Sequence, residues 1–203
     1  MKIIFLLALS LFSCDKIHTN AESISAPALS TGDTKESARI KSFATEAKKF
    51  CKEHKFNAKI FFLVDMSLHS GKKRFFVFDM KADSVVCKAL VAHGACGNDF
   101  LENAKFSNEK GCGCSAVGKC KIGGKYNGRF GTAYKLYGLD SSNSNVFARA
   151  IVLHSYYTVP DKETYPDPIG NSLGCPMVSA NFLKQLESRI DKSATPILLW
   201  IVN

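Results

Sequence analysis

Apolar positions near the start of the chain recur at helical intervals. Within residues 33–51 they are Ile40, Phe43, Ala44, Ala47, Phe50 and Cys51. Asp33 and Glu36 have the spacing of an N-cap and an N3 residue, which marks the beginning of a helix. We therefore predict one amphipathic helix, packed on the outside of a sheet.

Short runs of β-branched and aromatic residues follow, and such runs predict strands. They occupy residues 59–65 (KIFFLVD), 74–79 (RFFVFD), 85–92 (VVCKALVA), 132–137, 148–154 and 197–202 (ILLWIV). Gly71 lies in the first gap and Asp83 in the second, as expected for hairpins. Residues 181–190 predict a short second helix. Strands outnumber helices, so the predicted fold is mainly β with peripheral helices (α+β).

The N-terminal residues indicate export. Residues 1–13 (MKIIFLLALSLFS) hold one Lys and an apolar stretch too short to anchor in a bilayer, as in a secretory signal peptide. Leu11, Ser13 and Cys14 resemble the lipobox of bacterial lipoproteins, which implies a lipidated Cys14 tethered to a membrane. The alternative is an ordinary cleaved signal with Cys14 lost or incidental. Residues 14–32 are predicted to be a flexible stalk, and residues 33–203 the folded domain.

Composition narrows the classes of partner. Lys and Arg number 27 against 18 Asp and Glu, a formal net charge of +9, and 46% of the 203 residues are hydrophobic. This is the composition of a globular domain, and no apolar run reaches membrane-spanning length. The positive charge suits an anionic partner. Scattered basic residues and predicted export argue against nucleic acid.

One histidine and one cysteine are the candidates for chemistry. His154 closes the apolar run 151–153, which places an imidazole at the end of a buried strand. Cys175 lies between Gly174, which permits a sharp turn, and Pro176, which fixes φ. A thiol presented on such a turn becomes a nucleophile when a neighbouring His lowers its pKa or takes its proton. The alternative is a half-cystine on a loop and an unrelated histidine.

A family resemblance bears on this choice. The sequence Ser172-x-Gly174-Cys175, with a His at an upstream strand end, is similar to the catalytic signature of the YkuD-like L,D-transpeptidases that remodel peptidoglycan. Further similar segments follow in family order: LVAHG (90–94), FSN (106–108), YNGRFGTAYKLYGLD (126–140), ARAIVLH (148–154) and GNSLGCPMV (170–178). The resemblance covers most of residues 59–202 and implies an L,D-transpeptidase-like β-sandwich catalytic domain.

The resemblance also implies roles. Cys175 would be the nucleophile and His154 the general base. Gly174 and Cys175 would supply oxyanion-hole N–H groups, and the Ser172 hydroxyl would support the turn or the thiolate. The thiol would attack the carbonyl between the diamino acid at stem position three and D-Ala, leaving a thioester. An amine from another stem would then form a 3→3 cross-link, or water would complete an L,D-carboxypeptidase reaction. Such acyl transfer needs no metal or organic cofactor.

The chain departs from the family beside the nucleophile. Many members carry an Arg one or two positions after the Cys, where this chain has Pro176 and Met177. Another branch has an Arg where this chain has Asn171. The group that anchors the stem carboxylate must therefore come from elsewhere, with Arg149, Arg129 or a lysine as candidates.

Four residues are assigned to the substrate side of the site: Ser155, Arg149, His93 and Asn108. Ser155 would line the same wall as His154. His93 matches the family in VAHG, and its alternative role is that of a structural, hydrogen-bonded histidine near the cleft.

Six further cysteines remain after these assignments: Cys51, Cys87, Cys96, Cys112, Cys114 and Cys120. The last four cluster with His93 in spacings unlike the common zinc patterns. In an exported protein, disulfides that restrain a long loop are favoured over a metal site. We predict at least one disulfide among these four and a free thiol at Cys175. A redox role for Cys112-Gly113-Cys114 is weaker, because the spacing is not C-x-x-C.

The sequence thus predicts a monomeric enzyme of the cell envelope. Its partners would be peptidoglycan stem peptides and, through the lipid, a membrane whose leaflet stays open. Two alternatives without catalysis remain: a peptidoglycan-binding lipoprotein that has lost turnover, and a basic surface protein that binds anionic glycans.

Overall fold

The computed structural model describes residues 31–203, so the predicted signal peptide, Cys14 and most of the stalk lie outside it. Eight strands form one sheet in the order β3-β2-β1-β8-β4-β5-β6-β7. The strands are β1 (Ile60–Asp65), β2 (Phe75–Asp79), β3 (Ser84–Ala89), β4 (Gly118–Gly128), β5 (Gly131–Gly138), β6 (Val152–Ser155), β7 (Met177–Val178) and β8 (Leu198–Val202). The helices are α1 (Thr31–Glu53), α2 (Ala180–Ile190) and the short η1 (Ser141–Asn143). The mainly β prediction with peripheral helices is confirmed.

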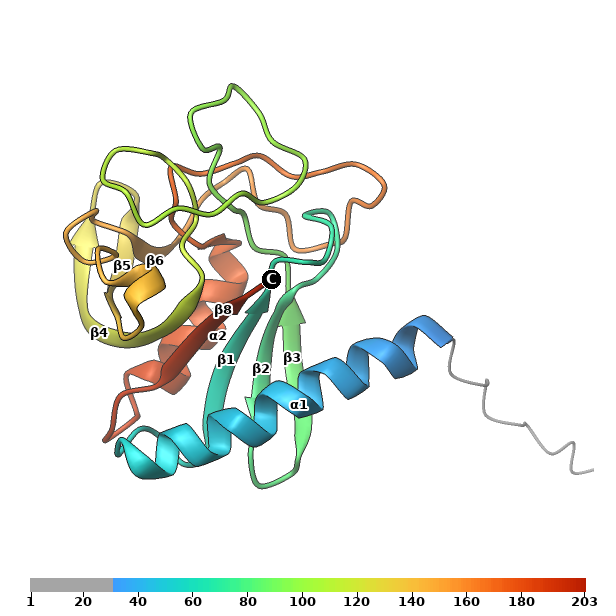
Figure 1. The fold of residues 1–203 in the computed structure, drawn as a ribbon, viewed down its shortest axis with the longest axis vertical. Coiled ribbons are helices and arrows are strands. Elements are labelled where there is room, and N and C mark those ends of the chain that lie inside the picture. The colour runs from blue at the N-terminus through green and yellow to red at the C-terminus, as the bar shows by residue number, and fades with distance from the viewer. Residues whose placement is uncertain (1–30) are drawn as a thin grey trace, which may run out of the picture.

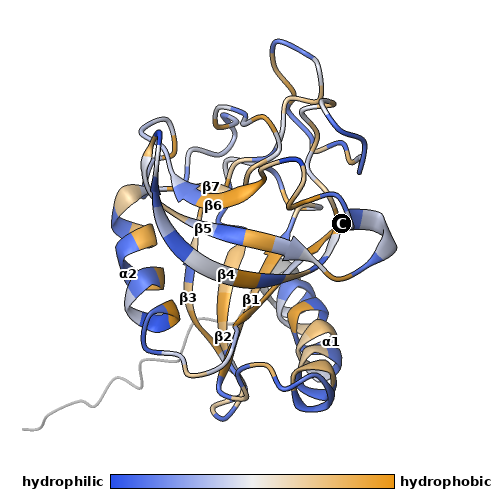
Figure 2. Cartoon of the chain, turned by 90° about the vertical axis from the view of Figure 1, so that its left-hand side faces the viewer, coloured by the Kyte–Doolittle hydropathy of each residue, from blue (hydrophilic) through white to orange (hydrophobic). Residues whose placement is uncertain are grey.

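The sheet is mixed and strongly bent. The β1–β8 and β6–β7 pairs are parallel, and the other neighbours are antiparallel. β4 curves across the molecule, and its register with β5 shifts between Ile122 and Lys125 (Figures 1 and 2). Phe62 and Val77 of one half share a core cluster with Tyr134 and Leu153 of the other. One continuous sheet therefore packs against itself as the two layers of a sandwich.

Helix α1 covers the outer face of β1, β2 and β8 (Figure 1). Ala44 and Ala47 of the helix lie in one cluster with Phe61, and Phe43 packs edge-on against Trp200 at 5.2 Å between ring centroids. Phe62, on the opposite side of β1, faces the sandwich interior and the cluster that includes α2. Because both faces of β1 and β8 are covered, these strands are apolar at successive positions.

Several predicted boundaries were wrong. β4 was missed because its Gly and Lys content hides the alternation of a strand, and β7 because it has only two residues. The run 148–154 was predicted to be one strand, but β6 begins at Val152 after a turn in which Ala150 has a φ of 54°. Helix α1 begins at Thr31 rather than after an N-cap at Asp33. Within residues 31–203 no helix is both long and apolar enough to cross a bilayer.

Long loops gather at one end of the sheet (Figure 1). The loop after β3 meets β7 through a bridge between Ala92 and Met177, and meets the segment before β7 through a bridge between Gly94 and Ser172. The end of β6 lies beside β7, with His154 in register with Met177. This arrangement places His154 next to the turn formed by Ser172–Cys175.

Candidate active site

The turn that carries Cys175 depends on glycine. Gly174 has a φ of 113°, which L side chains rarely adopt. A Cβ at this position would also lie 2.7 Å from the carbonyl oxygen of Cys114. The Ser172 hydroxyl accepts a hydrogen bond from the Gly174 N–H at 3.0 Å and closes the turn. The positive φ and the nearby carbonyl oxygen of Cys114 together require a glycine at position 174.

His154 is oriented by the main chain. Its Nδ1 lies 3.0 Å from the carbonyl oxygen of Ser155, so Nδ1 carries the proton and donates it. The other ring nitrogen, Nε2, has no hydrogen-bond partner in the described part of the chain. Burial lowers the pKa of His154, and the bond to Ser155 opposes this only in part. At neutral pH the imidazole is therefore uncharged, with Nε2 able to accept a proton.

Cys175 and His154 line the same cavity, of about 180 Å³. The remaining lining residues are Tyr126, Gly128, Arg129, Phe130, Gly131, Ala133, Ala150 and Val152. Phe130, at the tip of the β4–β5 hairpin, stacks on His154 with 5.4 Å between ring centroids and 16° between ring planes. The Phe130 ring thus covers one face of the imidazole, and the hairpin tip and Cys175 line the same cavity.

The Cys175 thiol is half-buried and uncharged at neutral pH. The N–H of Val152 points to Sγ at 3.4 Å, and the carbonyl of Ala150 lies 3.9 Å from it. Burial raises the pKa of Cys175, although the Val152 N–H and the charge of Arg149 oppose the rise. Within residues 31–203, His154 makes no direct hydrogen bond to Sγ. The resting site is therefore a neutral thiol beside a neutral imidazole.

The two N–H groups that were expected to bind an oxyanion, those of Gly174 and Cys175, differ in their hydrogen bonding. Because the Gly174 N–H is bonded to the Ser172 hydroxyl, it is not available to a developing oxyanion. The N–H of Cys175 has no acceptor among the described residues. Of the two predicted donors, only Cys175 therefore remains free. The hydroxyl of Ser172 holds the turn and does not contact the thiol.

The match to a family of known proteins covers most of the chain. The sequence model of the L,D-transpeptidase catalytic domain matches residues 34–199. The chain belongs to this family. No curated protein sequence matches the chain significantly.

Solved structures also resemble this L,D-transpeptidase domain. One is the L,D-transpeptidase from Mycobacterium smegmatis, with 11% identity over 71% of this chain and 59% of that one, and a TM-score of 0.43. A mutant of the helical cell shape determining protein Pgp2 from Campylobacter jejuni has 13% identity over 70% and 46%, and a TM-score of 0.43. An L,D-transpeptidase from Xylanimonas cellulosilytica has 11% identity over 75% and 68%, and a TM-score of 0.40. The chain therefore spans between 46% and 68% of these proteins.

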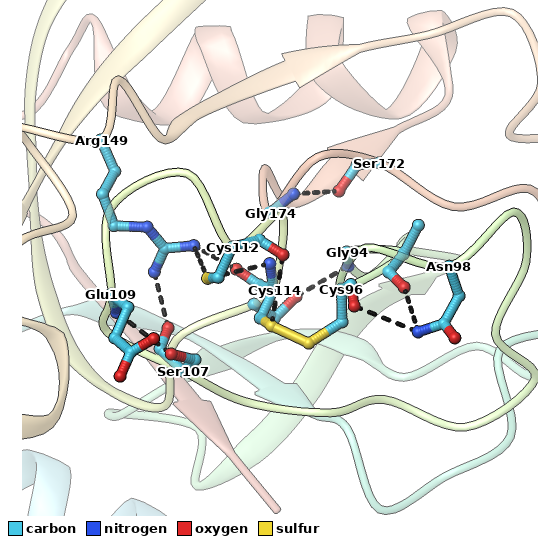
Figure 3. The surroundings of a disulfide bond; sticks show 12 residues. Gly94, Cys96, Asn98, Ser107, Glu109, Cys112, Cys114, Arg149, Ser172 and Gly174 are labelled. Carbon is cyan, nitrogen blue, oxygen red and sulfur yellow. Dashed lines mark hydrogen bonds between the residues drawn. A yellow bond between two sulfur atoms is a disulfide. The ribbon is translucent and has the colours of Figure 1, made fainter.

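Arg149 does not have the position expected of a carboxylate anchor in this transpeptidase domain. Its guanidinium donates to the carbonyls of Ser107 and Cys114 and to the sulfur of Cys112 (Figure 3). These three acceptors lie on the loop between β3 and β4. Arg149 therefore fixes that loop behind Gly174, and only its charge reaches Cys175.

His93 and Asn108 were predicted to face the substrate, and the structure places both elsewhere. His93 has no exposed surface, and its Nδ1 lies 2.8 Å from the guanidinium of Arg74. Burial, with the Arg74 charge, lowers the pKa of His93 to about 4, so it is a neutral structural residue. The side chain of Asn108 donates to the carbonyl of Ser141 and accepts from the N–H of Asn145, joining two loops. Neither residue lines the cavity of His154 and Cys175.

The cysteine cluster contains one disulfide, between Cys96 and Cys114 (Figure 3). The prediction of at least one disulfide among the four cysteines is confirmed, as is the free thiol at Cys175. Cys112 and Cys120 are free, and burial raises the pKa of Cys120 to about 12. Within residues 31–203, no group of three or more His, Cys, Asp or Glu side chains could hold a metal ion.

The contribution of the hairpin tip was missed from the sequence. Arg129 was noted as one cation among several, and Phe130 was not singled out. The available signal was an arginine and an aromatic residue between Gly128 and Gly131, a spacing typical of a turn. Only the bend of the sheet, which lays β5 beside β6, shows that this tip covers His154.

Proposed function

We propose that this domain is a cysteine-dependent L,D-transpeptidase that acts on peptidoglycan stem peptides. The observation that carries the proposal is the cavity shared by Cys175 and a neutral, oriented His154. Membership of the L,D-transpeptidase family supplies the substrate class. Side chains alone suffice for acyl transfer through a thioester.

In the first half-reaction, His154 Nε2 takes the thiol proton as Sγ attacks the carbonyl between the third stem residue and D-Ala. The Val152 N–H stabilises the sulfur as it becomes charged. The free N–H of Cys175 lies on the same residue and is available to the oxyanion. When the intermediate collapses, the C–N bond breaks and His154 returns the proton to the leaving amine of D-Ala. A thioester on Cys175 remains.

In the second half-reaction, the amine of another stem attacks the thioester and His154 accepts its proton. The C–S bond breaks as the new amide, a 3→3 cross-link, forms, and His154 passes the proton to the sulfur, which restores the thiol. Water in place of the amine gives the L,D-carboxypeptidase reaction. Both outcomes use the same Cys175 and His154 chemistry and differ only in the acceptor.

The proposed place of action is the cell envelope, where the family's substrate lies. A disulfide between Cys96 and Cys114 supports export, because such bonds persist in oxidising compartments. A signal peptide at residues 1–13 and a lipid on Cys14 belong to this proposal.

The test combines acylation with turnover. The wild type, Cys175→Ala and His154→Ala are incubated with a carbapenem, whose strained carbonyl acylates nucleophiles, and the intact mass is measured. The same proteins are given tetrapeptide stems with and without an acceptor stem, and D-Ala and cross-linked products are quantified. Cys175→Ala should form no adduct and release no D-Ala. His154→Ala should be slowed by about 100-fold or more.

The outcomes separate the candidates. Cross-links in the wild type identify a transpeptidase, and D-Ala release without cross-links identifies a carboxypeptidase. A wild type that neither forms an adduct nor releases D-Ala, while still binding the stems, would point to a peptidoglycan-binding lipoprotein. D-Ala release that survives in Cys175→Ala would refute the mechanism.

A further inference from the structure

The cavity of Cys175 and His154 contains a single cationic residue, Arg129, and no acidic one. Arg129 belongs to the tip of the β4–β5 hairpin and is exposed. None of the ion pairs between described residues involves it. Its guanidinium is therefore available to a ligand in this cavity. An unpaired guanidinium matches a carboxylate, which it can bind through two parallel hydrogen bonds.

Two other cations near the site are less suited. The donors of Arg149 are already used by the carbonyls of Ser107 and Cys114 and by Cys112. Lys135 lines a neighbouring cavity of about 270 Å³, together with Tyr126 and Phe147, rather than the cavity of Cys175. Of these three cations, only Arg129 lines the cavity of Cys175.

Phe130 couples the position of Arg129 to that of the general base. The guanidinium carbon of Arg129 lies 5.5 Å from the centre of the Phe130 ring, within the range of a cation–π contact. The same ring stacks on His154 at 5.4 Å. Phe130 also packs edge-on against Tyr156 at 5.1 Å. The guanidinium, the phenyl ring and the imidazole therefore form one connected group above the nucleophile.

The proposed substrate has a carboxylate within reach of such a group. In a stem that ends in D-Ala, three bonds of about 1.3–1.5 Å each separate the scissile carbonyl carbon from the terminal carboxylate carbon. A carbonyl placed against Cys175 therefore keeps that carboxylate inside or at the mouth of the same small cavity. A stem extended by one residue has a neutral amide at this point.

We infer that Arg129 binds the terminal carboxylate of the donor stem. This inference rests on the proposed function, because it concerns the substrate of the same cavity. The residues of this chain that flank Cys175 include no arginine, so this role falls to Arg129. Recognition comes from the hairpin that also covers His154.

The experiment compares two donors that differ only at the terminus. One is a tetrapeptide stem with a free D-Ala carboxylate, and the other is the same stem with a C-terminal amide. The kcat/KM for release of D-Ala or D-alaninamide is measured for the wild type, Arg129→Ala and Arg129→Lys. The wild type should prefer the acid by about 10-fold or more. Arg129→Ala should bring this preference close to one by losing activity on the acid alone, and Arg129→Lys should retain part of it.

Two matched variants control for charge. Lys184→Ala removes an exposed positive charge on α2, away from the cavity, and should leave the preference unchanged. Lys135→Ala removes the cation of the neighbouring cavity and should also leave it unchanged. Binding of both stems to Cys175→Ala and to Cys175→Ala/Arg129→Ala is measured by calorimetry, so that recognition is tested without turnover.

An unchanged acid preference in Arg129→Ala, or its loss in Lys135→Ala instead, would overturn the inference. Equal binding of both stems to Cys175→Ala would overturn it as well. If the wild type releases nothing but Cys175→Ala prefers the acid through Arg129, the proposed catalysis fails and the carboxylate site stands. The two conclusions can therefore fail separately.

Discussion

Removal of the Cys96–Cys114 disulfide is expected to destabilise the domain by about 3 kcal/mol. The bond joins residues separated by 18 positions. The loop-closure entropy that a ring of this size removes from the unfolded chain corresponds to about 3 kcal/mol at 25 °C. The hydrogen bond from the Cys96 N–H to the Gly113 carbonyl forms only in the folded loop, so it does not replace the restraint on the unfolded chain. The double variant Cys96→Ser/Cys114→Ser should therefore unfold at lower denaturant concentration.

The assay is urea unfolding followed by circular dichroism, with thermal unfolding as a second measurement. For a domain of this size, a loss of about 3 kcal/mol corresponds to a fall in Tm of about 6–12 °C. Cys112→Ser is the matched control, because it removes a neighbouring thiol and leaves the disulfide in place. Reduction of the wild type with dithiothreitol should reproduce the double variant. A loss below about 1 kcal/mol in both experiments would show that the loop is restrained in the unfolded chain by something other than this bond.

Three further outcomes are expected. Gly174→Ala should slow carbapenem acylation by about 10-fold or more in stopped-flow experiments, because a φ of 113° and the carbonyl of Cys114 both oppose a side chain; an unchanged rate would contradict the close approach. Phe130→Ala should expose His154, raise its lowered pKa and move the acidic limb of the kcat/KM profile to higher pH; Phe130→Tyr should not. Cys14→Ala should abolish labelling by a fatty-acid analogue, and labelling that persists would refute the lipobox interpretation.

The strands buried on both faces could be predicted from sequence, and the exposed or short ones could not. β1 and β8 are continuous apolar runs because α1 covers one face and the sandwich interior the other. β4 carries Gly123, Gly124 and several lysines, and all six of its residues past Ile122 are exposed or only partly buried, so no alternation marks this half. Pairing with β5 and β8 makes it a strand, and that pairing is a property of the folded chain.

Local sequence offered His154 and Cys175 as a candidate reactive pair, and the family resemblance favoured them over a half-cystine and an unrelated histidine. A histidine at a strand end and a cysteine after a glycine turn carry their own signals. The partners of Arg149 and His93 carry no such signal, because Ser107, Cys114 and Arg74 lie between 19 and 42 residues away from them in the sequence. Burial then decided the role of His93, since a fully enclosed imidazole has no surface to offer a substrate.

The carbonyl of Ser155 gives this site an orienting group that no mutation of a side chain can delete. In many triads a carboxylate performs this task, and its replacement by alanine reveals it at once. Here replacement of Ser155 by alanine would leave the carbonyl in place, although this group fixes the tautomer of His154. A carbonyl also carries no charge with which to hold an imidazolium. In the proposed mechanism, the proton that His154 takes from the thiol would therefore be held weakly and readily given to the departing amine.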